Sequence, residues 1–154
     1  MTLTLRRAVA VLAATTAALG WVVAPADATS YRFWSYWSGG SDWTFASQGA
    51  SRRPTDGAVE GWRFAISEAS SSSTPPRHSP GFAQLCGDTD PVDGNKRVGL
   101  VIDAGTDADA PDGESPPALV ATCVVVPTDA NGYDVLAAAG TQLRTDGGLI
   151  CGIN

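Results

Sequence analysis

Aromatic side chains crowd one short part of the chain, between residues 31 and 64. This stretch holds four of the five tryptophans, Trp34, Trp37, Trp43 and Trp62. Leaving so much aromatic surface in water is unfavourable, so these side chains form either a compact β core or a stacking surface for a flat apolar ligand. That choice limits the folds open to the chain and frames the question of its function.

The first 28 residues are typical of a secretory signal peptide. Two arginines give a positive start, residues 8–24 form an almost uncharged apolar run, and residues 26–28 supply a small-x-small cleavage pattern. The apolar run is about 17 residues long, near the lower limit for a membrane span, so an uncleaved anchor is the alternative. We expect cleavage after Ala28, a single domain over residues 29–154, and a secreted protein or one on the extracellular cell surface.

The chain is acidic, with 10 basic and 16 acidic residues. Without the predicted signal peptide these become 8 and 15, a net charge of about −7. That charge argues against nucleic acid and against anionic membrane surfaces as partners. No second apolar segment reaches spanning length, so we expect no membrane span in the mature chain.

The three cysteines, Cys86, Cys123 and Cys151, are an odd number for an exported protein. One thiol is therefore left for a partner chain or for a fourth cysteine in sequence not present here, and we expect the chain to be truncated relative to its relatives. We expect a disulfide between Cys86 and Cys123, which closes a loop of about 37 residues. No C-x-x-C pair occurs and His78 is the single histidine, so a metal at the cysteines is not expected.

Strand signals dominate the chain after the signal peptide. Aromatic and β-branched runs predict strands over residues 31–37, 43–46, 58–66, 97–103, 119–126 and 148–153. Because side chains alternate along a strand, Phe33 and Trp37 would lie on one face of the first strand, and Trp34 and Tyr36 on the other.

Two further segments complete the predicted organisation. Residues 69–81 are rich in Ser and Pro and predict a flexible loop. Residues 133–139 carry apolar side chains at helical spacing, followed by Gly140, and predict one short helix. The fold class expected from this pattern is α+β, a mostly antiparallel sheet of five to seven short strands with one short helix.

Two acidic loops raise a calcium hypothesis. Residues 88–94 and 107–113 both follow a D-x-D-x-x-D-G spacing, and calcium is bound by carboxylate oxygens. Each run is one residue longer than the start of an EF-hand loop and lacks that loop's final glutamate. Solvated acidic turns are therefore the default interpretation, and we expect no metal site.

Catalytic motifs are missing from the sequence. It contains no nucleophile elbow, no zinc-protease helix motif and no phosphate-binding loop. His78 lies in the predicted flexible loop, where no rigid scaffold would hold an acid–base group. We expect no enzyme, no catalytic residue and no cofactor.

Several motifs carry a resemblance to known proteins. Residues 33–37 (FWSYW), Trp43 and residues 56–64 (DGAVEGWRF) resemble a signature of bacterial transcobalamin-like domains. These domains are relatives of the small C-terminal β-domain of the intrinsic factor and transcobalamin carriers. Residues 131–140 and 148–154 resemble the other half of that domain, so the two halves stand in reversed order here. A circular permutation, or pairing of two half-domains, would produce that order.

Nearly all of the mature chain also resembles a group of exported actinobacterial proteins whose genes lie beside vitamin-type ECF transporter components. The shared segments are residues 56–64, 96–103 and 148–153. This resemblance implies a non-enzymatic accessory that captures a corrinoid (cobalamin) or another vitamin outside the membrane. A domain this small would cover only one face of so large a ligand, so an extracytoplasmic partner protein or transporter is expected to complete the site.

The resemblance also implies which aromatic residues meet the ligand. The expected ligand-facing set is Trp34, Tyr36, Trp37 and Trp43, whereas Trp62 is expected to be core. The alternative function is a cell-surface interaction module that pairs with a partner chain through the same aromatic strand and has no small-molecule ligand.

Overall fold

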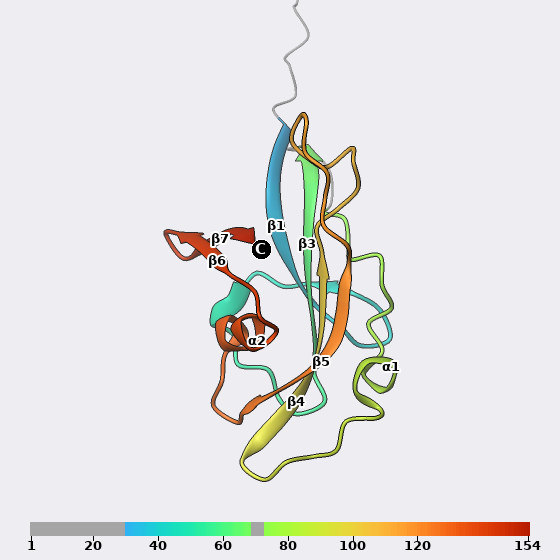
Figure 1. Cartoon of the computed structure of the whole chain (residues 1–154), viewed down its shortest axis with the longest axis vertical. Helices are drawn as coiled ribbons and strands as arrows, with labels where there is room; N and C mark the ends of the chain where they lie inside the picture. The colour runs from blue at the N-terminus through green and yellow to red at the C-terminus, as the bar shows by residue number, and fades with distance from the viewer. Residues whose placement is uncertain (1–29, 69–72) are drawn as a thin grey trace, which may run out of the picture.

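A computed structural model describes residues 30–68 and 73–154 (Figure 1). The predicted signal peptide lies outside the described residues, as do residues 69–72 of the predicted flexible loop. The strands are β1 (Ser30–Ser38), β2 (Thr44–Phe45), β3 (Val59–Glu68), β4 (Asn95–Asp103), β5 (Val120–Pro127), β6 (Leu143–Asp146) and β7 (Leu149–Ile153). The helices are α1 (Phe82–Cys86) and α2 (Gly132–Ala138), with a 3-10 turn η1 (Gly49–Ser51).

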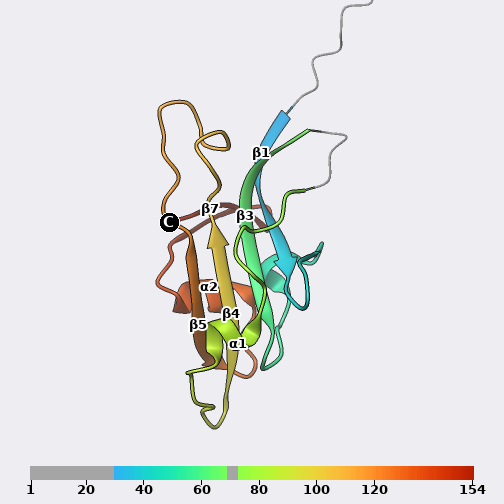
Figure 2. The same cartoon turned by 90° about the vertical axis from the view of Figure 1, so that its right-hand side faces the viewer.

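Five of these strands form one mixed sheet in the order β2-β1-β3-β4-β5, and β6 and β7 form a separate hairpin. The α1 helix lies on one face of the sheet, while α2 and the hairpin lie on the other (Figures 1 and 2). The expected α+β class is confirmed. The pair β3–β4 is parallel and the other pairs are antiparallel. A parallel pair needs a long crossover, and the connection that carries α1 supplies it.

The face covered by α2 holds the main apolar core. Val98 and Leu100 of β4 pack with Val124 of β5 against Val135 and Leu136 of the helix, and all five are buried. The Asn131 side chain accepts hydrogen bonds from the first helical N–H groups, and Asp134 completes a capping box. This cap starts the predicted helix at the right place, since it satisfies donors that have no partner inside the helix.

The face covered by α1 is tied down by the expected disulfide. Cys86 at the end of α1 is bonded to Cys123 in β5, which confirms that pairing, and Cys151 is a free, exposed thiol. The helix approaches the sheet closely at Gly99, where an added Cβ would lie 2.8 Å from the Leu85 side chain. A glycine at this position of β4 therefore allows α1 to pack.

Residues 73–81 of the predicted loop run across this same face. Pro76 is buried, and the backbone N–H of Arg77 donates to Asp103 at 2.9 Å. The flexibility of the whole loop stays a prediction. Neither α1 nor α2, the helices of the described residues, is long and apolar enough to cross a membrane.

Candidate functional site

The four aromatic residues of the expected ligand set do not share one surface. Trp34 and Tyr36 pack on the face of the sheet that holds the main core, the face of α2 and the hairpin. Trp37 and Trp43 lie on the α1 face, as the alternation of side chains along β1 requires for Trp37. The two pairs are therefore separated by the sheet itself.

Trp37 and Trp43 are engaged in packing. The Trp37 ring meets Phe45 edge-to-face at 5.6 Å, and its indole N–H donates to the Ser35 hydroxyl at 2.8 Å. The Trp43 ring lies directly over Gly61, where a Cβ would come within 2.6 Å of it. Its indole N–H donates to the carbonyl of His78 at 2.8 Å. Trp37 thus packs β1 against β2, and Trp43 holds the segment at His78 onto the α1 face.

Tyr36 is buried beside Trp62, with ring centroids 4.8 Å apart. Trp62 is in the core, as expected. The Tyr36 hydroxyl donates to Glu60 Oε1 at 2.5 Å, and burial raises the pKa of that hydroxyl above its usual value. Burial also raises the pKa of Glu60, and its Oε2 has no hydrogen-bond partner among the described residues. The Tyr36 and Trp62 side chains, although buried, lie in the wall of one hollow beside Trp34, whereas Glu60 is fully buried.

Trp34 is half-buried and is the member of the set that lines the most open surface. Its ring lies 5.5 Å from that of Phe64. Three adjoining hollows of about 240, 330 and 280 Å³ all have Trp34 in their walls. We call the surface that they form the Trp34 surface. Its other walls come from further residues of β1 and β3, from the loop 104–117, from the hairpin 143–154 and from the segment 45–50.

The rim of the Trp34 surface is polar. Arg32 donates from Nε to the carbonyl of Asp109 at 3.2 Å, and Arg144 donates from Nη2 to the carbonyl of Cys151 at 3.2 Å. Glu114 lies in the wall of the first hollow. An aromatic floor with charged groups at its edge suits a flat ligand that is apolar in the middle and polar at its periphery.

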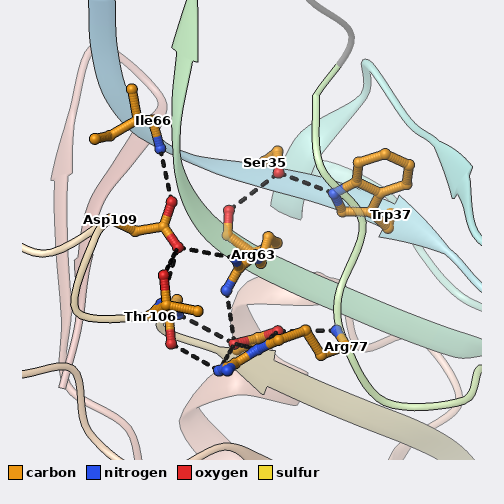
Figure 3. A network of polar contacts seen from close by, with 9 residues as sticks. Ser35, Trp37, Arg63, Ile66, Arg77, Thr106 and Asp109 are labelled. Carbon is orange, nitrogen blue, oxygen red and sulfur yellow. Dashed lines mark hydrogen bonds and ion pairs between the residues drawn. The ribbon is translucent and has the colours of Figure 1, made fainter.

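A buried ionic network holds the wall loop against the sheet (Figure 3). Arg63 of β3 donates to Asp103 and to Asp109, each at 2.9 Å, and Arg77 makes a second contact with Asp103 at 2.7 Å. Asp109 also accepts from the N–H and hydroxyl of Thr106. Burial alone would raise the pKa of Asp103 and Asp109, but these hydrogen bonds and the nearby guanidinium groups lower both pKa values below the usual range.

That network bears on the calcium hypothesis. Asp109, the central carboxylate of the second acidic loop, is occupied by Arg63 and by backbone N–H groups. Within residues 30–68 and 73–154, no group of three or more His, Cys, Asp or Glu side chains is placed to hold a metal ion.

Several walls of the Trp34 surface are not indicated by any sequence motif of a binding site. Phe64 was assigned to a strand without a site role, and the hairpin residues Leu149 and Ile150 were assigned only to a final strand. The signal for the hairpin is Asp146-Gly147-Gly148, because consecutive glycines with positive φ make the tight turn that joins two strands. Within this turn, Gly148 accepts a hydrogen bond from the Tyr133 hydroxyl of α2 at 3.0 Å.

The chain is a small α+β domain with an open, partly aromatic surface around Trp34. The family model of the SCO2322-like domain matches residues 26–154, and the chain belongs to that family. No curated protein and no solved structure matches the chain.

Proposed function

We propose that this chain is an exported, non-enzymatic binding domain that helps to capture a corrinoid or another vitamin together with a partner protein. The observation that carries the proposal is the position of Trp34, where three hollows with aromatic and aliphatic walls meet. A flat ring system would stack on Trp34 and Phe64, while its polar edges would meet the rim at Arg32 and Arg144.

The openness of the surface supports the need for a partner. Each hollow is shallow and of about 240 to 330 Å³, at or below the lower end of the range for sites that enclose a drug-sized ligand. The domain would therefore contact one side of a corrinoid and leave the other side for a second protein. The resemblance to transcobalamin-like β-domains, which close over a ligand held by a second domain, agrees with this division of the site.

Equilibrium dialysis of the mature protein against cyanocobalamin tests the proposal, because it reports binding without relying on tryptophan emission. We expect weak, saturable binding that Trp34→Ala reduces by roughly 2- to 12-fold, the loss of an aromatic contact worth about 0.5–1.5 kcal/mol.

Trp37→Phe is the matched control, because Trp37 lies on the opposite face and phenylalanine keeps most of its packing against Phe45. It should leave the dissociation constant unchanged. An absence of saturable binding by the wild-type protein, or an equal loss in both variants, would refute a corrinoid site at Trp34.

A further inference from the structure

The two sides of β1 are paired very differently. On one side β3 pairs with β1 along its whole length, from Ser30 to Ser38. On the other side β2 pairs with Trp37 and Ser38, and within the described residues no other strand pairs with β1. In the described part of the chain, the edge of β1 from residue 30 to residue 35 is therefore open, on the side of the sheet away from β5 (Figure 2).

The backbone of β1 fixes which polar groups this open edge presents. The carbonyl of Tyr36 accepts the N–H of Ala46 at 2.9 Å, so the backbone groups of Tyr36 point outward. Because this direction alternates along a strand and the register with β3 is unbroken, the N–H and C=O groups of Arg32 and Trp34 point outward too. They offer a donor and an acceptor at every second residue.

Two hollows of the Trp34 surface run alongside these groups. One is lined by the consecutive residues 33–36, by the segment 45–50 and by the tip of the hairpin. The next is lined by residues 32–34, by residues 149–151 of β7 and by Phe64, so it also extends over β3. Together they form a slot beside residues 32–36 of β1. The slot begins where the pairing of β2 with β1 ends and extends in the same direction.

The side chains around the slot are unusually apolar for an exposed position. Phe33 is 39% exposed, Phe45 51% and Leu149 73%, and all three line the slot. An open strand edge bordered by exposed aromatic and aliphatic groups is the arrangement that other chains join by adding a strand.

We infer that the slot binds an extended peptide segment of a partner protein, which adds to β1 as a strand in line with β2. Its backbone would pair with the outward groups of Arg32 and Trp34, and alternate apolar side chains would enter the hollows beside Trp34, Phe45 and Leu149. The spacing of the outward donors and acceptors matches an extended peptide backbone, and the existing β2–β1 pairing sets its line. This inference goes beyond the vitamin site and stands without it.

A random eight-residue peptide library displayed on phage, panned against the mature protein, supplies the probe. We expect enriched peptides that, once synthesised and labelled, bind saturably by fluorescence anisotropy. In nitrogen–proton correlation spectra, the amide protons of Arg32 and Trp34 should shift downfield and exchange more slowly when peptide is bound.

Arg32→Pro is the decisive variant. It removes an outward N–H without touching the β3 pairing, and edge strands accept proline at such a position. Loss of one backbone hydrogen bond should weaken peptide binding by roughly 2- to 12-fold. Arg32→Ala is the reference variant, because it loses the same guanidinium, including its contact with Asp109, but keeps the backbone N–H. The weakening is therefore measured for Arg32→Pro relative to Arg32→Ala.

Three results would overturn the inference. They are a library that yields no binder, peptides whose affinity Arg32→Pro and Arg32→Ala change equally, and peptides that shift residues away from β1. Sedimentation equilibrium tests whether a second copy of this chain occupies the slot. A dimer of the mature protein that Arg32→Pro abolishes would show that a second copy of this chain, and not a partner peptide, fills the slot.

Discussion

Glu60 and Asp103 are both fully buried, but the protein stabilises the charged form of Asp103 and the neutral form of Glu60. Asp103 faces two guanidinium groups and accepts backbone N–H bonds, so its charged form is stabilised. Glu60 receives one hydrogen bond, from the Tyr36 hydroxyl. The charges of Arg52 and Lys96 oppose the effect of burial, but the Lys96 ammonium donates to three backbone carbonyls and not to Glu60. Burial therefore favours a neutral Glu60.

Glu60→Gln should alter how stability depends on pH. The pKa of Glu60 is higher in the folded protein than in the unfolded chain, where it is near 4.5. Its contribution to stability is therefore fully present below that unfolded value and is lost as the pH rises through the folded pKa. Asp103 and Asp109, whose pKa values are lowered, add stability as the pH rises through their unfolded values near 3.8. Urea unfolding is therefore measured from pH 5 to pH 8, where the wild type should lose the contribution of Glu60 with rising pH.

The glutamine variant, which stays neutral, should lose less stability over the same range. The control is Asp129→Asn, which removes an exposed carboxylate and should leave the dependence of stability on pH as in the wild type. Asp134→Asn cannot serve as the control, because it would break the cap of α2. If the free energies of unfolding of Glu60→Gln and the wild type change with pH in the same way, ionisation of Glu60 does not affect stability and the prediction is wrong.

Asp103→Asn should be strongly destabilising. It removes a charge from between Arg63, which is almost fully buried, and Arg77. Breaking one side of a buried ion pair leaves the other charge uncompensated and costs about 3–5 kcal/mol. Denaturant unfolding at pH 7 measures that loss. Asp56→Asn, which disturbs the exposed pair with Arg97, is the control and should change stability little.

The sequence predicts the secondary structure elements that have a strong local pattern. The continuous apolar run of β4 marks a strand buried on both faces, and Asn131 with Asp134 marks the start of α2. The helix α1 was missed because it is five residues long and depends on the disulfide and on Gly99 for its position. Such a helix has little stability of its own.

The cap of α2 can be tested directly. Asn131→Ala removes the acceptor for the N–H groups of Tyr133 and Asp134 and should lower the free energy of unfolding by about 1 kcal/mol. The exposed Asp129→Ala, two residues earlier, should have no such effect. Equal stability of the two variants in thermal or denaturant unfolding would show that the capping box contributes nothing.

At the scale of the whole molecule, the disulfide joins the crossover connection to the far edge of the sheet. Cys86 and Cys123 are 37 residues apart in the chain, and on chain-entropy grounds closing such a loop stabilises the fold by about 3–4 kcal/mol. Replacing both cysteines by alanine in a Cys151→Ser background should lower the free energy of unfolding by that amount. Denaturant unfolding would show the loss as a lower midpoint concentration. A midpoint close to that of the Cys151→Ser protein would contradict the prediction.

The Trp34 surface is also a property of the whole molecule, which is why the sequence predicts it only in part. Trp34 was expected from the aromatic density of β1. Its neighbours come from β3, the loop 104–117 and the hairpin 143–154, segments that no local pattern brings together. The loop is placed by the tertiary contacts of Arg63 with Asp103 and Asp109. Asp109 belongs to the acidic run 107–113, whose spacing raised the calcium hypothesis.

Cys151 gives this molecule a built-in attachment point. The other two cysteines are joined on the α1 face, so a maleimide dye or a nitroxide would modify this exposed thiol alone. The label would stand at the border of two hollows of the Trp34 surface. Its emission or line shape would then report whatever occupies that surface, a vitamin or a peptide, with the buried core left as it is.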